Sequence, residues 1–184
     1  CRGSRVKDGI EIEKVIDLPD GTKWHKPKDS EEYTKLRNIK FREWWRKWNQ
    51  NVLHDELMMP IVIPKYNIGI ILHNGNEKIL YYLEPWCDRI YTDVNIDDYI
   101  AFEQPKTKFD LSKRCYNLEQ ESSDNIIVNI DGTTFGQDDY MNMQSLSQII
   151  QDSGSIGTFK LGSLHITVNS LETFEKNLIK CITD

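Results

Sequence analysis

Short apolar runs separated by turn residues dominate the hydrophobic pattern of the chain. Residues 66–72 and 77–84 are nearly all apolar, and the four residues between them, 73–76, are His-Asn-Gly-Asn. Asn-Gly between two such runs is the strongest short signal for a type I′ turn, so this stretch predicts a hairpin of two central strands. Residues 18–21 and 162–163 indicate two further hairpin turns. Because a hairpin joins consecutive antiparallel strands, we expect a mostly antiparallel sheet.

Apolar residues recur at helical spacing in other parts of the chain. The longest predicted helix covers residues 30–53 and follows a capping-box pattern. A shorter helix is expected over residues 140–152, and a C-terminal helix is expected after Asn169. Residues 103–125 are mostly polar and predict mostly loop. The whole chain, residues 1–184, is therefore predicted to be a single α+β domain, in which hairpins build the sheet and the long helix and the C-terminal helix pack against it.

The long predicted helix is rich in tryptophan. Three of the five tryptophans of the chain lie within the ten residues KFREWWRKWN, and on a helical wheel one apolar stripe is formed by Phe41, Trp44, Trp45, Trp48 and Val52. Such a stripe is expected to be buried against the sheet, with Lys and Arg side chains extending along its edges. The alternative is an exposed stripe that binds a protein partner, nucleic acid or a membrane surface. Trp and Arg are enriched where proteins bind partners, and Trp also stacks on nucleic-acid bases.

Charge is unevenly distributed along the chain. The 184 residues have 28% charged residues, a proportion typical of a soluble globular protein, and a net charge of -6. The segment from Lys35 to Trp48 holds six basic residues and one acidic residue, a local charge of +5, which leaves -11 for the remainder. An acidic surface repels phosphate backbones, so nucleic-acid binding is disfavoured. Charge segregation of this kind favours steered association with a charged protein.

These features lead us to expect a non-enzymatic binding module whose partner is a protein. Small acidic proteins that neutralise basic toxins or nucleases, such as immunity proteins, share this charge profile. The residues expected to contact the partner are Arg42, Arg46, Lys47, Asp93, Asp97, Asp98, Asp138 and Asp139. No cofactor or metal site is expected, because the acidic clusters at 93–98 and 137–139 lack the glycine and the final glutamate of a calcium loop.

His165 and Thr167 are the sharpest candidates for chemistry. In Leu164-His-Ile-Thr-Val168, the alternation of a strand places both side chains on one face. This pattern resembles one half of the motif of the 2H phosphoesterases, in which two H-x-[ST] strands place two histidines across a cleft. The resemblance implies that His165 would act as a general acid or base on a phosphodiester and that Thr167 would hold the phosphate. The chain has one copy of the motif, and His73 is the expected second histidine of this alternative, a phosphodiesterase or nuclease.

The four cysteines are scattered at positions 1, 87, 115 and 181 and match no zinc or CxxC spacing. Reduced thiols in a cytosolic protein are our preferred interpretation, and two disulfides in a secreted protein are an alternative. Because the chain begins at Cys1, the position is interpreted either as a fragment boundary or as the lipid-modified end of an exported lipoprotein. No apolar run approaches the roughly 18 residues that a transmembrane helix needs.

Overall fold

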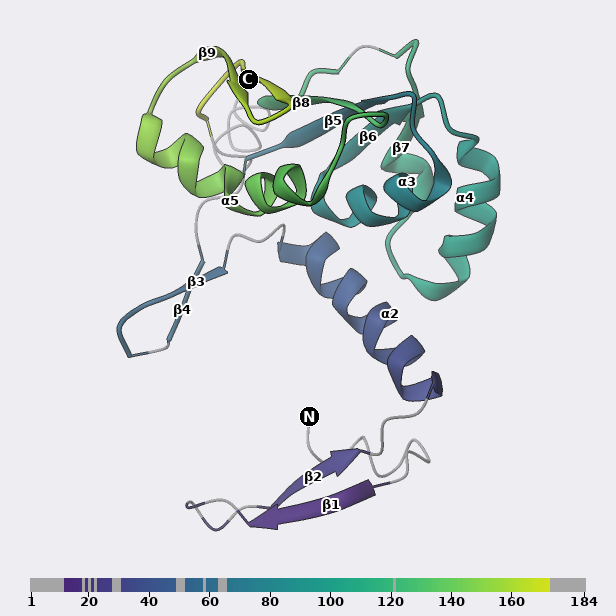
Figure 1. Ribbon diagram of the computed structural model, residues 1–184, viewed down its shortest axis with the longest axis vertical. Coiled ribbons are helices and arrows are strands. Elements are labelled where there is room, and N and C mark those ends of the chain that lie inside the picture. Colours follow the sequence, from purple (N-terminus) through teal and green to yellow (C-terminus); the bar gives the residue numbers. More distant parts are fainter. Residues whose placement is uncertain are drawn as a thin grey trace, which may run out of the picture. The chain divides into compact units, whose positions relative to one another are not determined.

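The computed structural model describes nine stretches of the chain: residues 12–17, 19, 21, 23–27, 31–48, 52–57, 59–62, 66–120 and 122–172 (Figure 1). The chain forms two compact units, residues 1–42 and 43–184. The prediction of a single domain over residues 1–184 stays a prediction.

The first unit contains one predicted hairpin and most of the long helix. Strands β1 (Ile12–Asp17) and β2 (Lys23–Pro27) pair antiparallel, which confirms the hairpin predicted around residues 18–21. Helix α2 (Glu31–Trp48) begins in this unit and ends in the second. Its start agrees with the predicted helix, and its first turn carries two glutamates, where the helix dipole favours negative charge.

Helix α2 ends earlier than predicted, because the next residues form a small hairpin. Strand β3 (Val52–His54) pairs antiparallel with β4 (Pro60–Val62). Asp55 closes the turn, since its carboxylate accepts hydrogen bonds from the backbone N–H groups of Leu57 and Met59, at 2.9 and 2.8 Å. Val52, the last predicted member of the tryptophan stripe, therefore lies outside the helix.

A six-stranded mixed sheet forms the centre of the second unit. Its strands, in spatial order, are β7 (Cys115–Asn117), β6 (Arg89–Thr92), β5 (Ile68–His73), β8 (Ile126–Asp131), β10 (Leu164–Val168) and β9 (Gly157–Leu161). The β5–β6, β6–β7 and β5–β8 pairs are parallel, and the other two are antiparallel. The predicted α+β class is confirmed in its coarse form. The predicted hairpin around residues 162–163 is also confirmed, as β9–β10.

The hairpin predicted across residues 73–76 is wrong, because the second apolar run is a helix. Strand β5 is followed by α3 (Glu77–Leu83), which leads into the parallel strand β6. The side chain of Asn76 caps this helix by accepting a hydrogen bond from the N–H of Ile79 at 3.0 Å. Asn74 adopts a positive φ of 51° at the turn. The apolar run suits a helix because Leu80 and Leu83, three residues apart, both face the core.

The other helices follow the remaining strands of the second unit. Helix α4 (Ile96–Glu103) and the short 3-10 helices η1 (Glu84–Trp86), η2 (Gln104–Lys106) and η3 (Leu111–Lys113) connect β5, β6 and β7. Helix α5 (Gln137–Ser153) confirms the helix predicted over 140–152 and ends at Gly154, whose φ of 57° is left-handed. The C-terminal helix predicted after Asn169 falls mostly on residues 173–184, which lie outside the described residues.

The main core lies between the six-stranded sheet and the helices. Helices α3 and α5 lie on the same side of the sheet (Figure 1). The strand residues that face them are fully or almost fully buried, among them Ile70, Leu72, Val128, Ile130 and Ile166. Among the helices of the described residues, none is long and apolar enough to cross a membrane.

Candidate functional site

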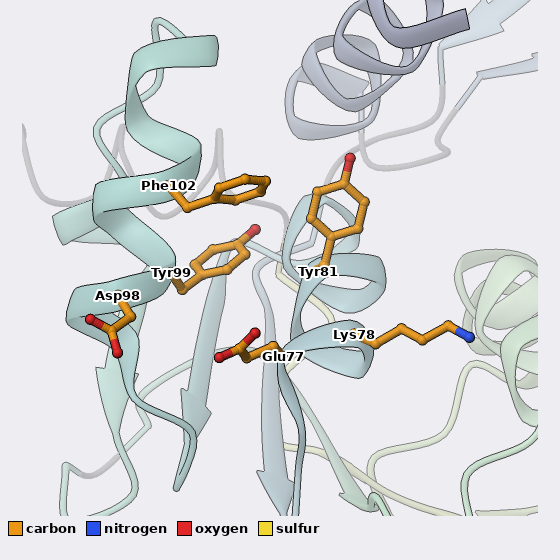
Figure 2. A pocket seen from close by; sticks show the side chains of 6 residues that line it. All are labelled: Glu77, Lys78, Tyr81, Asp98, Tyr99 and Phe102. Atoms are coloured by element: carbon orange, nitrogen blue, oxygen red, sulfur yellow. The ribbon is translucent and has the colours of Figure 1, made fainter. Parts of the chain in front are cut away.

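A groove between α3 and α4 is the candidate functional site. It has a volume of about 620 Å³ and is lined by Glu77, Lys78, Tyr81, Asp98, Tyr99 and Phe102. Tyr99 and Phe102 project from α4 toward α3, Tyr81 rises from α3, and the ammonium group of Lys78 points away from the three rings (Figure 2). Ligand pockets in proteins usually have volumes of roughly 300–1,000 Å³ and mostly apolar walls with a few polar groups, as this groove has.

The two helices supply their lining residues at the same spacing. Glu77, Lys78 and Tyr81 occupy positions i, i+1 and i+4 of α3, and the three residues from α4 follow the same pattern. Residues four apart lie on one side of a helix, so α3 contributes one acidic residue and one aromatic ring to the groove, and α4 contributes one acidic residue and two rings. The start of α4 is fixed by Asn95, whose amide N–H donates to a carboxylate oxygen of Asp98 at 2.7 Å.

A buried ion-pair cluster lies behind the groove, and we define it as Arg46, Glu84, Tyr99, Glu103 and Arg114. The guanidinium of Arg46 donates to Glu84 at 2.7 Å and to Glu103 at 2.9 Å. Arg114 donates to the second carboxylate oxygen of Glu84 at 2.8 Å. The hydroxyl of Tyr99 donates to Glu84 at 3.0 Å, which connects the cluster to the groove. The guanidinium groups of Arg46 and Arg114 offset the carboxylates of Glu84 and Glu103 in the interior, and the ammonium group of Lys106 lies 3.5 Å from Glu103.

The protonation states of the cluster are held by these contacts. Burial acts to raise the pKa of Glu84, but the hydrogen bonds and charges of Arg46 and Arg114 outweigh it, so the pKa lies below its ordinary value. Burial acts to lower the pKa of Arg46, but Glu84 and Glu103 outweigh it and the pKa is raised. Both residues are therefore charged at neutral pH.

The stability of the fold is expected to depend on pH through Glu84. Because folding lowers the pKa of Glu84, its ionised carboxylate stabilises the fold at pH values above the unfolded pKa, roughly 4.3, and this contribution is lost as the pH falls through the folded pKa. Urea unfolding between pH 7 and pH 3 measures the effect. We expect the free energy of unfolding to fall less steeply below pH 4 in Glu84→Gln than in the unsubstituted chain, and equal slopes would contradict this role of Glu84.

Exposed acidic residues gather at the carboxyl ends of the parallel strands, and two of them, Glu77 and Asp98, line the groove. We call this set the acidic edge: Glu77, Asp93, Asp97, Asp98, Asp131 and Asp138. The carboxyl ends of parallel strands meet at one edge of a sheet, which brings these residues from four segments together. Asp93 accepts hydrogen bonds from the N–H groups of Asn74 and Gly75, at 2.7 and 3.1 Å. Hydrogen bonds from Thr133 hold the pKa of Asp131 below its ordinary value.

The predicted partner-binding residues fall into two groups. Asp93, Asp97, Asp98 and Asp138 are exposed and belong to the acidic edge, and Lys47 is exposed on α2. The other three are buried: Arg42, Arg46 and Asp139. Asp139 accepts hydrogen bonds from the N–H groups of Gly136 and Ser163, at 3.1 and 3.0 Å, and so ties the start of α5 to the β9–β10 turn.

The tryptophan stripe is buried at some positions and exposed at others. Trp45 packs against the core, and its ring centroid lies 3.4 Å from that of Trp86. Trp44 is 41% exposed and Phe41 is 54% exposed. The expectation of a stripe buried as a whole is confirmed only in part, because Trp45 is partly buried against the core, and it is wrong for Phe41 and Trp44. The packing of Trp45 and the burial of the adjacent Arg46 fix the last turn of α2 in the second unit.

The structure places His73 and His165 on strands that are not neighbours. Strand β8 lies between β5 and β10, where His165 pairs with Asn129 and Asn129 pairs with Ile71. With roughly 4.8 Å between strands and 3.3 Å per residue, the Cα atoms of the two histidines are about 12 Å apart. Thr167 Oγ1 lies 3.2 Å from Thr158 Oγ1, beside His165 on the same strand. The phosphodiesterase alternative stays a prediction.

The described cysteines are buried and free. Cys87 and Cys115 form no disulfide, and burial raises the pKa of Cys115 to about 12. Cys1 and Cys181 lie outside the described residues, so the lipoprotein alternative stays a prediction. Within the described stretches, no group of three His, Cys, Asp or Glu side chains is arranged to hold a metal ion.

Sequence reasoning missed most of the groove. Only Asp98 among its lining residues was a candidate, because residues 77–84 were predicted as a strand, which would place Glu77 and Lys78 on opposite faces. Asn76 is the signal that indicates a helix there, because asparagine favours the N-cap position and its side chain accepts a hydrogen bond from the backbone N–H of Ile79.

Comparison of the chain with protein-family models, with curated proteins and with solved structures finds no match. The site is therefore characterised by its own geometry.

Proposed function

We propose that this chain is a non-enzymatic binding module that binds a protein partner with a basic surface. The observation that carries the proposal is the groove between α3 and α4, which combines three aromatic residues with two carboxylates. Aromatic residues are the most enriched contributors to the energetic centres of protein interfaces. An inhibitor of the immunity type, which neutralises a basic toxin or nuclease, is one form that this function could take.

The aromatic lining supports binding because it offers apolar area without requiring a change of fold. Phe102 is 60% exposed at the surface, whereas Tyr99 is buried at the base of the groove. When a partner covers an exposed ring, apolar surface is removed from water, which favours binding. The ring also loses few rotamers, because it has only two side-chain torsions.

Charge supports a basic partner. Two of the six residues of the acidic edge line the groove and the other four lie at the same edge of the sheet, where all six would attract a basic surface and align it during encounter. Exposed charges of this kind act mainly on the association rate and are screened by salt. Their position therefore favours a partner with Lys and Arg residues around an apolar or aliphatic centre.

Rigid groove walls support the proposal further. The buried ion-pair cluster connects α2, η1 and α4 through Arg46, Glu84 and Glu103. Side chains held in this way lower the entropy cost of binding, because the groove is formed before the partner arrives. Arg46 thereby positions the helices. The acidic edge and the aromatic rings of the groove make the contacts with the partner.

The test is capture of a partner by the full chain and by two matched variants. Tyr81 lines the groove, whereas the adjacent Tyr82 lines a second cavity between α3 and α5. We expect a stoichiometric protein partner to be captured from the native host by the unsubstituted chain and by Tyr82→Ala, and to be lost or reduced at least about tenfold with Tyr81→Ala.

The proposal also predicts how capture of the partner depends on salt. The amount of captured partner should fall as the salt concentration rises from 50 to 300 mM, and the same partner should be lost with Tyr81→Ala. Equal capture by Tyr81→Ala and Tyr82→Ala would contradict the assignment of the groove. Recovery of RNA or of small molecules alone would contradict the proposed class of partner.

A further inference from the structure

We propose that the groove between α3 and α4 receives the ammonium group of a lysine side chain from the partner, an inference that rests on the function proposed above. The groove offers two kinds of group that attract a cation: the aromatic rings, chiefly Tyr81 and Phe102, and the carboxylate of Glu77. Asp98 also lines the groove, but its carboxylate is directed away from the rings (Figure 2). The occupant is therefore a basic segment of a protein, anchored by one lysine.

The aromatic rings are suited to an alkylammonium group. An aromatic face carries negative charge density, and a cation within about 6 Å of the ring centroid is attracted to it. Phe102 and Tyr99 extend from α4 toward α3 and face the side on which Tyr81 rises, so a side chain that enters between the helices meets rings from both (Figure 2). The aliphatic stem of a lysine would meanwhile cover apolar area.

One ring of the groove already attracts an ammonium group in this structure. The Nζ atom of Lys106 lies 2.9 Å from the centroid of Phe102 and 3.5 Å from a carboxylate oxygen of Glu103. Lys106 is not among the residues that line the groove. This contact pairs one ring and one carboxylate with one ammonium group, which is the same combination that the groove offers with Tyr81 and Glu77.

The carboxylate of Glu77 decides the sign of the charge that the groove accepts. Glu77 extends from α3 toward α4 beneath the rings, whereas the ammonium group of Lys78 is directed away from them (Figure 2). A negative group that enters beneath the rings would meet the carboxylate of Glu77 and be repelled by it. A neutral apolar side chain would gain the contact with the rings but not the attraction of the carboxylate.

The experiment uses the full chain and short capped peptides that differ at one central residue. The peptides carry lysine, norleucine or glutamate between Gly-Ser and Ser-Gly flanks, and tetramethylammonium serves as the free cation. Binding is followed by NMR titration of the protein. We expect the lysine peptide to bind roughly 3- to 30-fold more tightly than the norleucine peptide, and the glutamate peptide to show no binding.

Variants locate the binding and act as controls. Phe102→Leu removes an exposed ring, and Glu77→Gln removes the carboxylate that extends beneath the rings. Both are expected to weaken the lysine peptide several-fold, whereas Tyr82→Ala, on the far side of α3, leaves its affinity unchanged. Equal binding of the lysine and norleucine peptides would overturn the inference. Tetramethylammonium binding as tightly as the lysine peptide would overturn the assignment of a protein side chain in favour of a free cation.

The outcomes separate this inference from the proposed function. If Tyr81→Ala loses a protein partner while the lysine and norleucine peptides bind equally, the binding function stands and the lysine inference fails. If the lysine peptide binds selectively while partner capture is indifferent to Tyr81→Ala, the groove binds lysine and the proposed docking of the protein partner there fails.

Discussion

Replacement of Glu84 by alanine is expected to lower the free energy of unfolding by about 3–5 kcal/mol. The Glu84 side chain is fully buried and accepts hydrogen bonds from Arg46 and Arg114. Its removal leaves two largely buried guanidinium groups with one carboxylate, Glu103, and a buried charge without its partner is costly. Urea unfolding of the variant and of the unsubstituted chain at pH 7 measures the difference.

The matched control for this prediction is Tyr99→Phe. This change removes one hydrogen bond to the same carboxylate and keeps the ring in place, so its expected cost is about 1–3 kcal/mol. If Glu84→Ala costs no more than Tyr99→Phe, the charges of the cluster are not what makes Glu84 important to stability.

Replacement of Leu80 by alanine is expected to cost about 2–5 kcal/mol, whereas Tyr82→Ala is expected to cost less than about 1 kcal/mol. Leu80 is fully buried in the core on the inner side of α3, and Tyr82 is 49% exposed on the outer side. The larger cost has two parts: the free energy that was gained by removing the apolar side chain from water, and the cost of the cavity that its removal leaves in the core. Thermal or urea unfolding of both variants gives the comparison.

This pair of variants also distinguishes a helix from a strand at residues 77–83. In a strand, Leu80 and Tyr82 would lie on the same face and their replacements would have similar effects. In a helix they lie on different sides, and only one of them is in the core. Similar costs for the two substitutions would contradict the helix α3 and, with it, the α3 side of the groove.

The sequence was most informative where an element depends on its own residues. The start of α2, helix α5 and the turns of the β1–β2 and β9–β10 hairpins were all predicted, because caps, apolar spacing and Gly-containing turns are local signals. The parallel pairs of β5 with β6 and β8 were not predicted. Partner strands in a parallel sheet are distant in sequence, and the choice among them is made by packing of the whole sheet against the helices.

The candidate site was less predictable for the same reason. Arg46 was singled out as a basic residue available to a partner, yet Glu84, which binds its guanidinium in the interior, is 38 residues away. Nothing near Arg46 in the sequence indicates that pairing. The groove depends on two helices, one of which was predicted as a strand, so its aromatic residues could not be assembled into one surface from the sequence alone.

Tyr99 connects the groove to helix α2, because its ring and its hydroxyl contact different parts of the second unit. Its ring lines the groove, while its hydroxyl donates to Glu84, which in turn pairs with Arg46 in the last turns of α2. A ligand that immobilises the ring therefore strengthens the attachment of that helix, and by thermodynamic reciprocity a loosened helix lowers the affinity for the ligand. Occupancy should be readable from slower amide hydrogen exchange at residues 45–48, at a distance from the occupied surface.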